Sequence, residues 1–116
     1  MPVQAQLVNL QDLPGIPCPC GVARRAFADR QEFPGTIHLT QISDDAAVHY
    51  HRDHTEVYIV LECDPDAQIE LDGQTHRLRP FTSILIPPGV RHRAIGKMKV
   101  LIVCHPEFDT EDEHFD

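Results

Sequence analysis

Residues 49–63 have the sequence HYHRDHTEVYIVLEC, which places two histidines on alternate positions shortly before a long apolar run. Because successive side chains of a strand point to opposite faces, His49 and His51 leave the same face of a predicted strand over 46–51. After a four-residue turn, Glu56 opens the next predicted strand. The spacing therefore predicts that one carboxylate returns beside two imidazoles.

Short β-like runs separated by turn residues continue outward from this stretch, and no amphipathic helical segment of useful length lies among them. The runs cover 36–42, 46–51, 56–62, 67–71, 74–78, 83–86, 92–95 and 98–104. Between the fourth and the fifth run, Asp72-Gly73 favours a tight type I′ turn, because both residues tolerate positive φ. The pattern predicts an all-β sandwich or barrel.

The composition divides the chain into three parts. Half of the ten prolines lie within 1–35, which predicts an extended N-terminal arm with at most a short turn of helix or strand around 22–28. The β-rich part covers 36–104. The last part, 105–116, holds six acidic residues and no lysine or arginine, and so forms an acidic tail. Its role is open between a disordered solubilising segment and a lid across a neighbouring barrel.

Size and charge exclude several classes of protein. A chain of 116 residues forms one domain with one core. Its longest apolar runs are five residues, too short to cross a membrane, and the first ten residues lack the pattern of a secretory signal, so we expect a cytoplasmic protein. Ten scattered basic residues do not form a nucleic-acid-binding patch.

The four cysteines give little indication of a disulfide framework or of a metal site. Cys18-Pro19-Cys20 is a weak metal signal without a second pair, and its role is left open. Cys104 is predicted to lie in the core. Because His105 follows it directly on a strand, the two side chains face opposite ways and do not form a nucleophile and base pair.

A further histidine completes the constellation. His92 follows the rigid turn Pro87-Pro88-Gly89, about thirty residues after Glu56. Two histidines, a glutamate and this histidine resemble the centres of the two sequence motifs of the cupin superfamily, namely HxH followed by four residues and Glu, and then PxGxxH. The resemblance covers residues 36–104. Asp44, Cys63 and Phe81 stand where the family has glycines.

The resemblance implies a small single-domain cupin, which is a double-stranded β-helix or jelly-roll barrel. It also implies one divalent transition metal ion, held in the barrel mouth by His49, His51, Glu56 and His92. Iron, manganese, nickel, zinc and copper all suit three imidazoles and a carboxylate, so the identity of the metal stays open.

An open metal site of this kind predicts a metal-dependent, dioxygenase-like enzyme that acts on a small organic molecule. The alternatives are a metal-dependent isomerase or lyase, and a non-enzymatic small-molecule binding or sensing cupin. Tyr58 shares the face of Glu56 and is a weak catalytic candidate. His38 either lines the pocket or lies at an unrelated surface position, and His54 is expected to be solvated, with a reserve role as ligand.

Two strands are apolar on both faces, namely 57–61 and 100–104. Because a barrel buries only one face of a strand, something must cover the other face, either the N-terminal arm or a second copy of the protein. We expect a homodimer.

Overall fold

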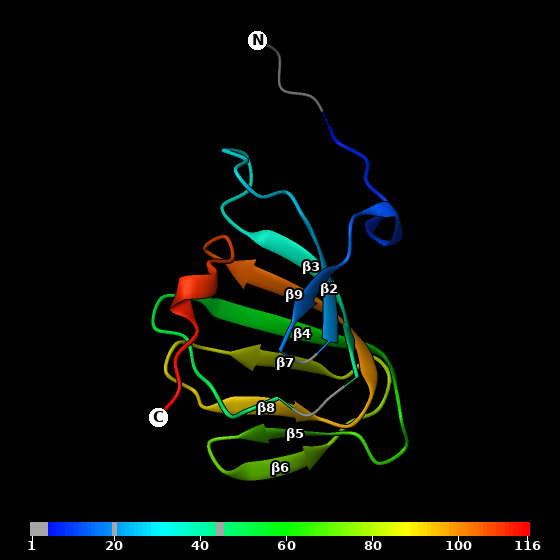
Figure 1. Ribbon diagram of the computed structural model, residues 1–116, viewed down its shortest axis with the longest axis vertical. Coiled ribbons are helices and arrows are strands. Elements are labelled where there is room, and N and C mark those ends of the chain that lie inside the picture. The colour runs from blue at the N-terminus through cyan, green and yellow to red at the C-terminus, as the bar shows by residue number, and fades with distance from the viewer. Residues whose placement is uncertain (1–4, 20, 44–45) are drawn as a thin grey trace.

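The computed structural model describes residues 5–19, 21–43 and 46–116. Within these ranges the chain forms two antiparallel sheets, one of six strands in the order β1-β2-β3-β9-β4-β7 and one of three strands in the order β6-β5-β8 (Figure 1). The strands are β1 (Ile16–Cys18), β2 (Gly21–Ala26), β3 (Thr36–Ile42), β4 (Thr55–Cys63), β5 (Gln68–Leu71), β6 (Gln74–Arg77), β7 (Ser83–Ile86), β8 (His92–Ile95) and β9 (Met98–His105). Two short 3-10 helices, η1 (Leu10–Asp12) and η2 (Thr110–Asp112), complete the fold.

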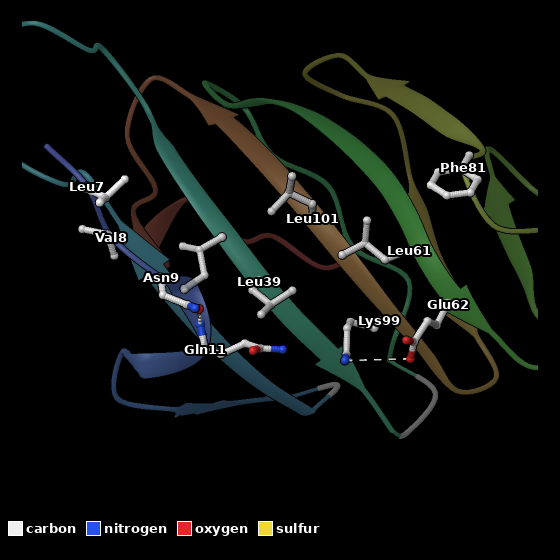
Figure 2. A pocket seen from close by; sticks show the side chains of 11 residues that line it. Leu7, Val8, Asn9, Gln11, Leu39, Leu61, Glu62, Phe81, Lys99 and Leu101 are labelled. Atoms are coloured by element: carbon white, nitrogen blue, oxygen red, sulfur yellow. Dashed lines mark hydrogen bonds and ion pairs between the residues drawn. The ribbon is translucent and has the colours of Figure 1, made fainter. Parts of the chain in front are cut away.

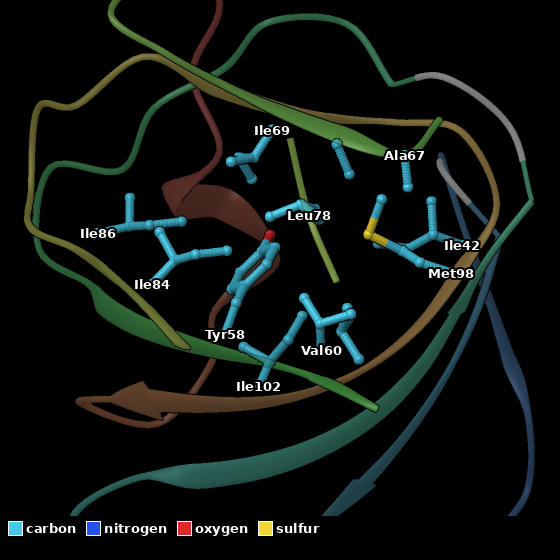
Figure 3. Close-up of a cluster of buried hydrophobic side chains, with 12 residues drawn as sticks. Ile42, Tyr58, Val60, Ala67, Ile69, Leu78, Ile84, Ile86, Met98 and Ile102 are labelled. Carbon is cyan, nitrogen blue, oxygen red and sulfur yellow. The ribbon is translucent and has the colours of Figure 1, made fainter. Parts of the chain in front are cut away.

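The expected all-β architecture is confirmed, and the hydrophobic core lies between the two sheets. Val60 and Val100 from the six-stranded sheet are fully buried, and Ile69 from the smaller sheet is 1% exposed. Figure 3 shows Tyr58 projecting into the same cluster. The cluster comprises Ile42, Tyr58, Val60, Ala67, Ile69, Leu78, Ile84, Ile86, Ala94, Met98, Val100 and Ile102.

Two of the turns with positive φ differ in how well their residues fit this conformation. The residues of one turn favour it, and the other turn has a phenylalanine where a glycine would be favoured. Asp72 and Gly73 both have positive φ, 47° and 85°, which confirms the type I′ hairpin between β5 and β6. Phe81 has φ 71°, so the backbone keeps the left-handed conformation that a glycine adopts more easily. Asp44 lies outside the described residues.

One predicted strand is wrong. Among residues 46–51, only isolated bridges form, from His49 to His92 and from Tyr50 to His114. The two residues bond to different partners, one at the start of β8 and one in the C-terminal tail, and therefore no continuous ladder can grow. This exchange of partners brings His49 directly beside His92.

The N-terminal segment contributes to the larger sheet. The short strand expected around 22–28 is β2 at Gly21–Ala26, and it pairs with β3 over its whole length. Ala23 and Ala26 are buried, 2% and 5% exposed, and Ala23 lines the interior cavity together with Arg25. Strands β1 and β2 of the expected arm thus widen the sheet and form one wall of the barrel.

The outer face of the six-stranded sheet is apolar. Leu39, Leu61 and Leu101 line a groove there, together with Leu7 and Phe81, which are 100% and 81% exposed (Figure 2). Five described residues that precede β1 also line this groove, namely Leu7, Val8, Asn9, Leu10 and Gln11. Neither 3-10 helix in the described ranges has the length or the apolar composition needed to span a membrane.

Candidate metal centre

Two loops and the start of one strand bring three histidines together. The backbones of His49 and His92 exchange two hydrogen bonds, of 3.1 and 2.8 Å. The backbone carbonyl of His51 accepts a hydrogen bond of 2.8 Å from the N–H of Gly89, whose φ of 88° tightens the turn ahead of β8. As a result, ligand atoms of the three imidazoles lie within 4.8 Å of one another.

Each of these imidazoles is oriented by a backbone carbonyl. The Nδ1 atom of His49 lies 3.0 Å from the oxygen of Ala47, that of His51 lies 2.7 Å from the oxygen of Asp112, and that of His92 lies 2.9 Å from the oxygen of Val90. Because a carbonyl only accepts hydrogen bonds, Nδ1 must carry the proton in all three rings. The lone pair of Nε2 is then available for a metal ion.

Glu56 completes the cluster from β4. Its Oε1 atom lies 3.0 Å from Nε2 of His51 and 3.5 Å from Nε2 of His92. These three atoms are buried, yet within the described part of the chain none has a hydrogen-bond partner. Buried polar atoms normally have a partner, so the orphaned atoms fit the donor set of a metal ion.

The buried charge of Glu56 sets the electrostatics of the cluster. Burial alone would raise the pKa of this carboxyl, but the imidazoles of His51 and His92 outweigh burial and hold the pKa below its usual range. Burial lowers the pKa of His51, but Glu56 outweighs it and raises the net value. Burial and the neighbouring His92 lower the pKa of His49. Glu56 therefore stays ionised and favours a positive charge beside it.

Sequence reasoning missed the residue that anchors the loop between His51 and Glu56. This residue is Asp112 in the acidic tail. The Asp112 carboxylate accepts hydrogen bonds from the backbone N–H groups of Arg52 and Asp53, each 2.9 Å long, and of His54, 3.0 Å long. Its backbone carbonyl holds His51, as described above. An aspartate in an acidic run gave no signal for this role. The tail is therefore ordered at Asp112 and packs on the loop between His51 and Glu56 of its own chain.

His54 is buried, only 2% exposed, and the expectation that it is solvated is wrong. Its Nε2 accepts a hydrogen bond of 3.1 Å from the N–H of Asp109. Its ring stacks on the ring of Phe108, with the two ring centres 5.7 Å apart. His51, His54 and Asp112 form a second group with ligand atoms within 4.8 Å. Hydrogen bonds within the chain already occupy the Asp112 carboxylate, so this group serves to hold the tail.

A cavity of about 170 Å³ opens beside the cluster, lined by His49, His51 and Glu56. Tyr58 lines it from β4, and His38 lines it from β3. Of the two alternatives for His38, a position at the pocket is therefore correct. His38 is 2% exposed, and burial, followed by the charge of Arg25, lowers its pKa to about 4. Its Nε2 lies 2.7 Å from the hydroxyl of Thr36.

Two of the cysteines lie in different environments, and the sequence predicted the position of one of them, Cys104. Cys104 is fully buried, which confirms its core position, and burial, followed by the charge of Glu56, raises the pKa of its thiol to about 12. Cys18 lines the cavity. Cys20 lies outside the described residues.

Comparison with known proteins places the fold. A family model for the cupin domain matches residues 37–104. A protein from Planctomyces limnophilus of known crystal structure is 41% identical, with 97% of each chain covered and a TM-score of 0.93. No curated protein matches the chain.

Two further structures share the fold at low identity. A variant of Streptomyces PAC13 with uridine is 12% identical, covers 97% of this chain and 90% of its own, and has a TM-score of 0.80. KdgF from Halomonas sp. is 16% identical and has a TM-score of 0.77, and the match covers 93% of this chain and 99% of the KdgF chain. The family model covers more than half of the chain, from β3 to β9, and the protein is therefore a member of the cupin family.

Proposed function

We propose that the protein is a metal-dependent enzyme that acts on a compact organic molecule. The observation that carries this proposal is the set of buried, unpartnered polar atoms in the cluster beside the cavity, namely Nε2 of His51, Nε2 of His92 and Oε1 of Glu56, within the described ranges. Three carbonyl-anchored histidines hold their Nε2 lone pairs toward one point, as metal sites require.

In this proposal His49, His51, Glu56 and His92 hold one divalent transition ion. A bound ion of this type supplies Lewis acidity toward a substrate oxygen, or redox chemistry with oxygen if the ion is redox-active. The chain's own residues orient the imidazoles, keep Glu56 ionised and limit the size of the substrate. With a volume of about 170 Å³, the cavity is smaller than the roughly 300 to 1,000 Å³ of ordinary ligand pockets, which favours a compact substrate.

The first reaction class to test is dioxygenase-like. Oxygen uptake by the Fe(II)-loaded protein is measured across a panel of phenols, thiols and diketones. Consumption that depends on one substrate class and is absent from a His49→Ala/His51→Ala variant supports this class. Silence across the panel with a fully loaded protein argues against it.

A lyase or isomerase is the second candidate, and a specific observation favours it. The PAC13 fold neighbour is described as a nucleoside dehydratase in its structure report. Here Tyr58 and His38 both line the cavity, and each can donate or accept a proton. In this case the Zn(II)- or Mn(II)-loaded protein turns over without oxygen, and Tyr58→Phe lowers kcat while metal content stays unchanged.

Metal content tests the whole proposal before any substrate is known. Purified protein should contain close to one transition ion per chain, and the His49→Ala/His51→Ala variant should lose it. A His76→Ala/His105→Ala variant is the matched control, because both of its histidines are exposed and lie outside the cluster. A wild-type protein that stays empty after supplementation with each candidate metal contradicts the proposal. A loaded protein without turnover leaves the binding role as the surviving alternative.

A further inference from the structure

Two polar groups on the β2 and β3 wall of the cavity have no role in the metal cluster. Within the described residues, the Nε atom of Arg25 and the hydroxyl of Thr40 are buried and have no hydrogen-bond partner. Thr40 is only 3% exposed, and both residues line the cavity. A buried donor without a partner costs free energy, so each group is suited to a ligand that supplies the missing acceptor.

The sheet register places these groups in the same sheet as Glu56, the proposed metal ligand of β4, but toward the β2 end of that sheet. Arg25 pairs with His38, His38 with Ile102, and Ile102 with Tyr58, so these four side chains form one row across the sheet. Adjacent strands lie about 4.8 Å apart, which separates the Arg25 and Tyr58 backbones by roughly 14 Å. Thr40 lies two residues along β3 from His38, on the same face of the sheet, and pairs with Ala23. The cavity thus has a β2 and β3 end and a metal end.

The guanidinium of Arg25 is held so that its edge stays available. Its central carbon lies over the Phe108 ring, 4.3 Å from the ring centre, in a cation–π contact that restrains the group. Stacking occupies the face of a guanidinium and leaves its N–H edge free to bond oxygens in its plane. This arrangement matches the planar geometry of a carboxylate.

Charge selects the end of the cavity at which an acid group binds. Among the described residues that line the cavity, Arg25 is the one with a permanent positive charge, while Glu56 and Glu113 carry carboxylates. Glu113 lies 3.7 Å from Nε2 of His49, at the metal end. In the metal-free cavity, an anionic group is repelled there by both glutamates and attracted by Arg25 at the other end.

We propose that the cavity binds a small carboxylic acid, with its carboxylate on Arg25, an oxygen on the Thr40 hydroxyl, and the remainder of the molecule directed toward the metal cluster. The inference rests on the proposed function for the reaction, but it concerns binding by the β2 and β3 wall, which can be measured on metal-free protein. It names the substrate class that the metal ligands alone leave open.

The test is calorimetric titration with matched pairs of probes, namely acetate, lactate, pyruvate and benzoate against the corresponding primary amides. Each pair has nearly the same shape, and only the acid carries a negative charge. We expect at least one acid to bind, and its amide to bind at least tenfold more weakly. Arg25→Gln should weaken binding of that acid by tenfold or more, and Thr40→Val should weaken it several-fold.

Arg24→Gln is the matched control. It removes the same charge from the next residue of β2, but Arg24 faces the outer side of the sheet and donates a hydrogen bond to the carbonyl of Leu13. Binding should stay within twofold of the wild type. Circular dichroism of each variant checks the fold, and Thr40→Val is nearly isosteric, so a misfolded Arg25→Gln protein still leaves one informative variant.

Repeating the titrations with metal-free and Mn(II)-loaded protein separates this inference from the proposed function. Acid binding that needs Arg25 but persists without metal supports the inference even if the metal assignment fails. The inference is overturned if no acid binds, if amides bind as well as acids, or if Arg25→Gln and Thr40→Val leave the affinity unchanged. It is equally overturned if acids bind only to loaded protein and independently of Arg25, because the metal then holds the carboxylate.

Discussion

Asp112→Asn tests whether the acidic tail stabilises the loop between His51 and Glu56, two of the proposed metal ligands. The side chain of Asp112 is 7% exposed, and its carboxylate accepts three backbone hydrogen bonds from the turn between His51 and Glu56. A fourth contact, of 3.1 Å, comes from Nε2 of His114. Asparagine keeps the shape of the side chain but loses the charge and one of the two acceptor oxygens.

The size of the effect follows from the pKa of Asp112. Burial alone would raise it, but the hydrogen bonds from Arg52, Asp53, His54 and His114 outweigh burial and lower the pKa from 3.8 to about 2. That difference corresponds to about 2 kcal/mol in favour of the folded carboxylate. We therefore expect Asp112→Asn to lower the free energy of unfolding by about 2 to 3 kcal/mol at pH 7.

The sign of the pH dependence follows from the same values. Because the folded pKa lies below the unfolded one, the contribution is fully present above about pH 4 and is lost as the pH falls toward 2. The difference between wild type and Asp112→Asn should therefore shrink as the pH falls through this window.

Urea unfolding followed by circular dichroism measures the difference at pH 7 and at pH 3. The control is Asp116→Asn, which makes the same charge change in the same tail at an exposed position paired with Arg91. We expect the control to cost less than about 1 kcal/mol. The argument is refuted if Asp112→Asn lies within about 0.5 kcal/mol of the wild type, or if both variants lose the same stability.

Three other predictions concern the surface, one turn and one thiol. Light scattering should give twice the chain mass of 13.1 kDa, and Leu101→Glu on the outer apolar face should give a monomer; a monomeric wild type contradicts the homodimer. Gly73→Ala should cost about 1 kcal/mol in urea unfolding, from its φ of 85° alone, since nothing lies within 4 Å of an added Cβ. Cys104 should resist alkylation at pH 8 until the protein is unfolded, because it is fully buried and its pKa is raised to about 12; rapid labelling of native protein would exclude a core position.

The sequence predicted the barrel strands closely because their pattern is local. Alternating burial along β4, the positive φ at Asp72 and Gly73, and the close spacing of turn residues are all properties of neighbouring residues. The predicted strand over 46–51 failed for the opposite reason. His49 and Tyr50 bond to partners at residues 92 and 114, and no local pattern specifies such a division.

The candidate site was likewise predicted from the sequence only in part. The spacing of His49, His51, Glu56 and His92 pointed to a metal cluster from the sequence alone, because it resembles the centres of the two cupin motifs, although residues 46–51 do not form the predicted strand. The burial of His54 could not be predicted, since it depends on Phe108 and Asp109 from the far end of the chain.

By itself, the sequence determined an all-β barrel and a cluster of candidate metal-binding side chains. Only the tertiary structure decided that the acidic tail anchors the ligand loop through Asp112, and that β2 and β3 bring Arg25 and Thr40 to the same cavity. The reason is that periodicity fixes which face a side chain leaves. Which distant segment meets that face depends on hydrogen bonds and packing between residues far apart in the chain.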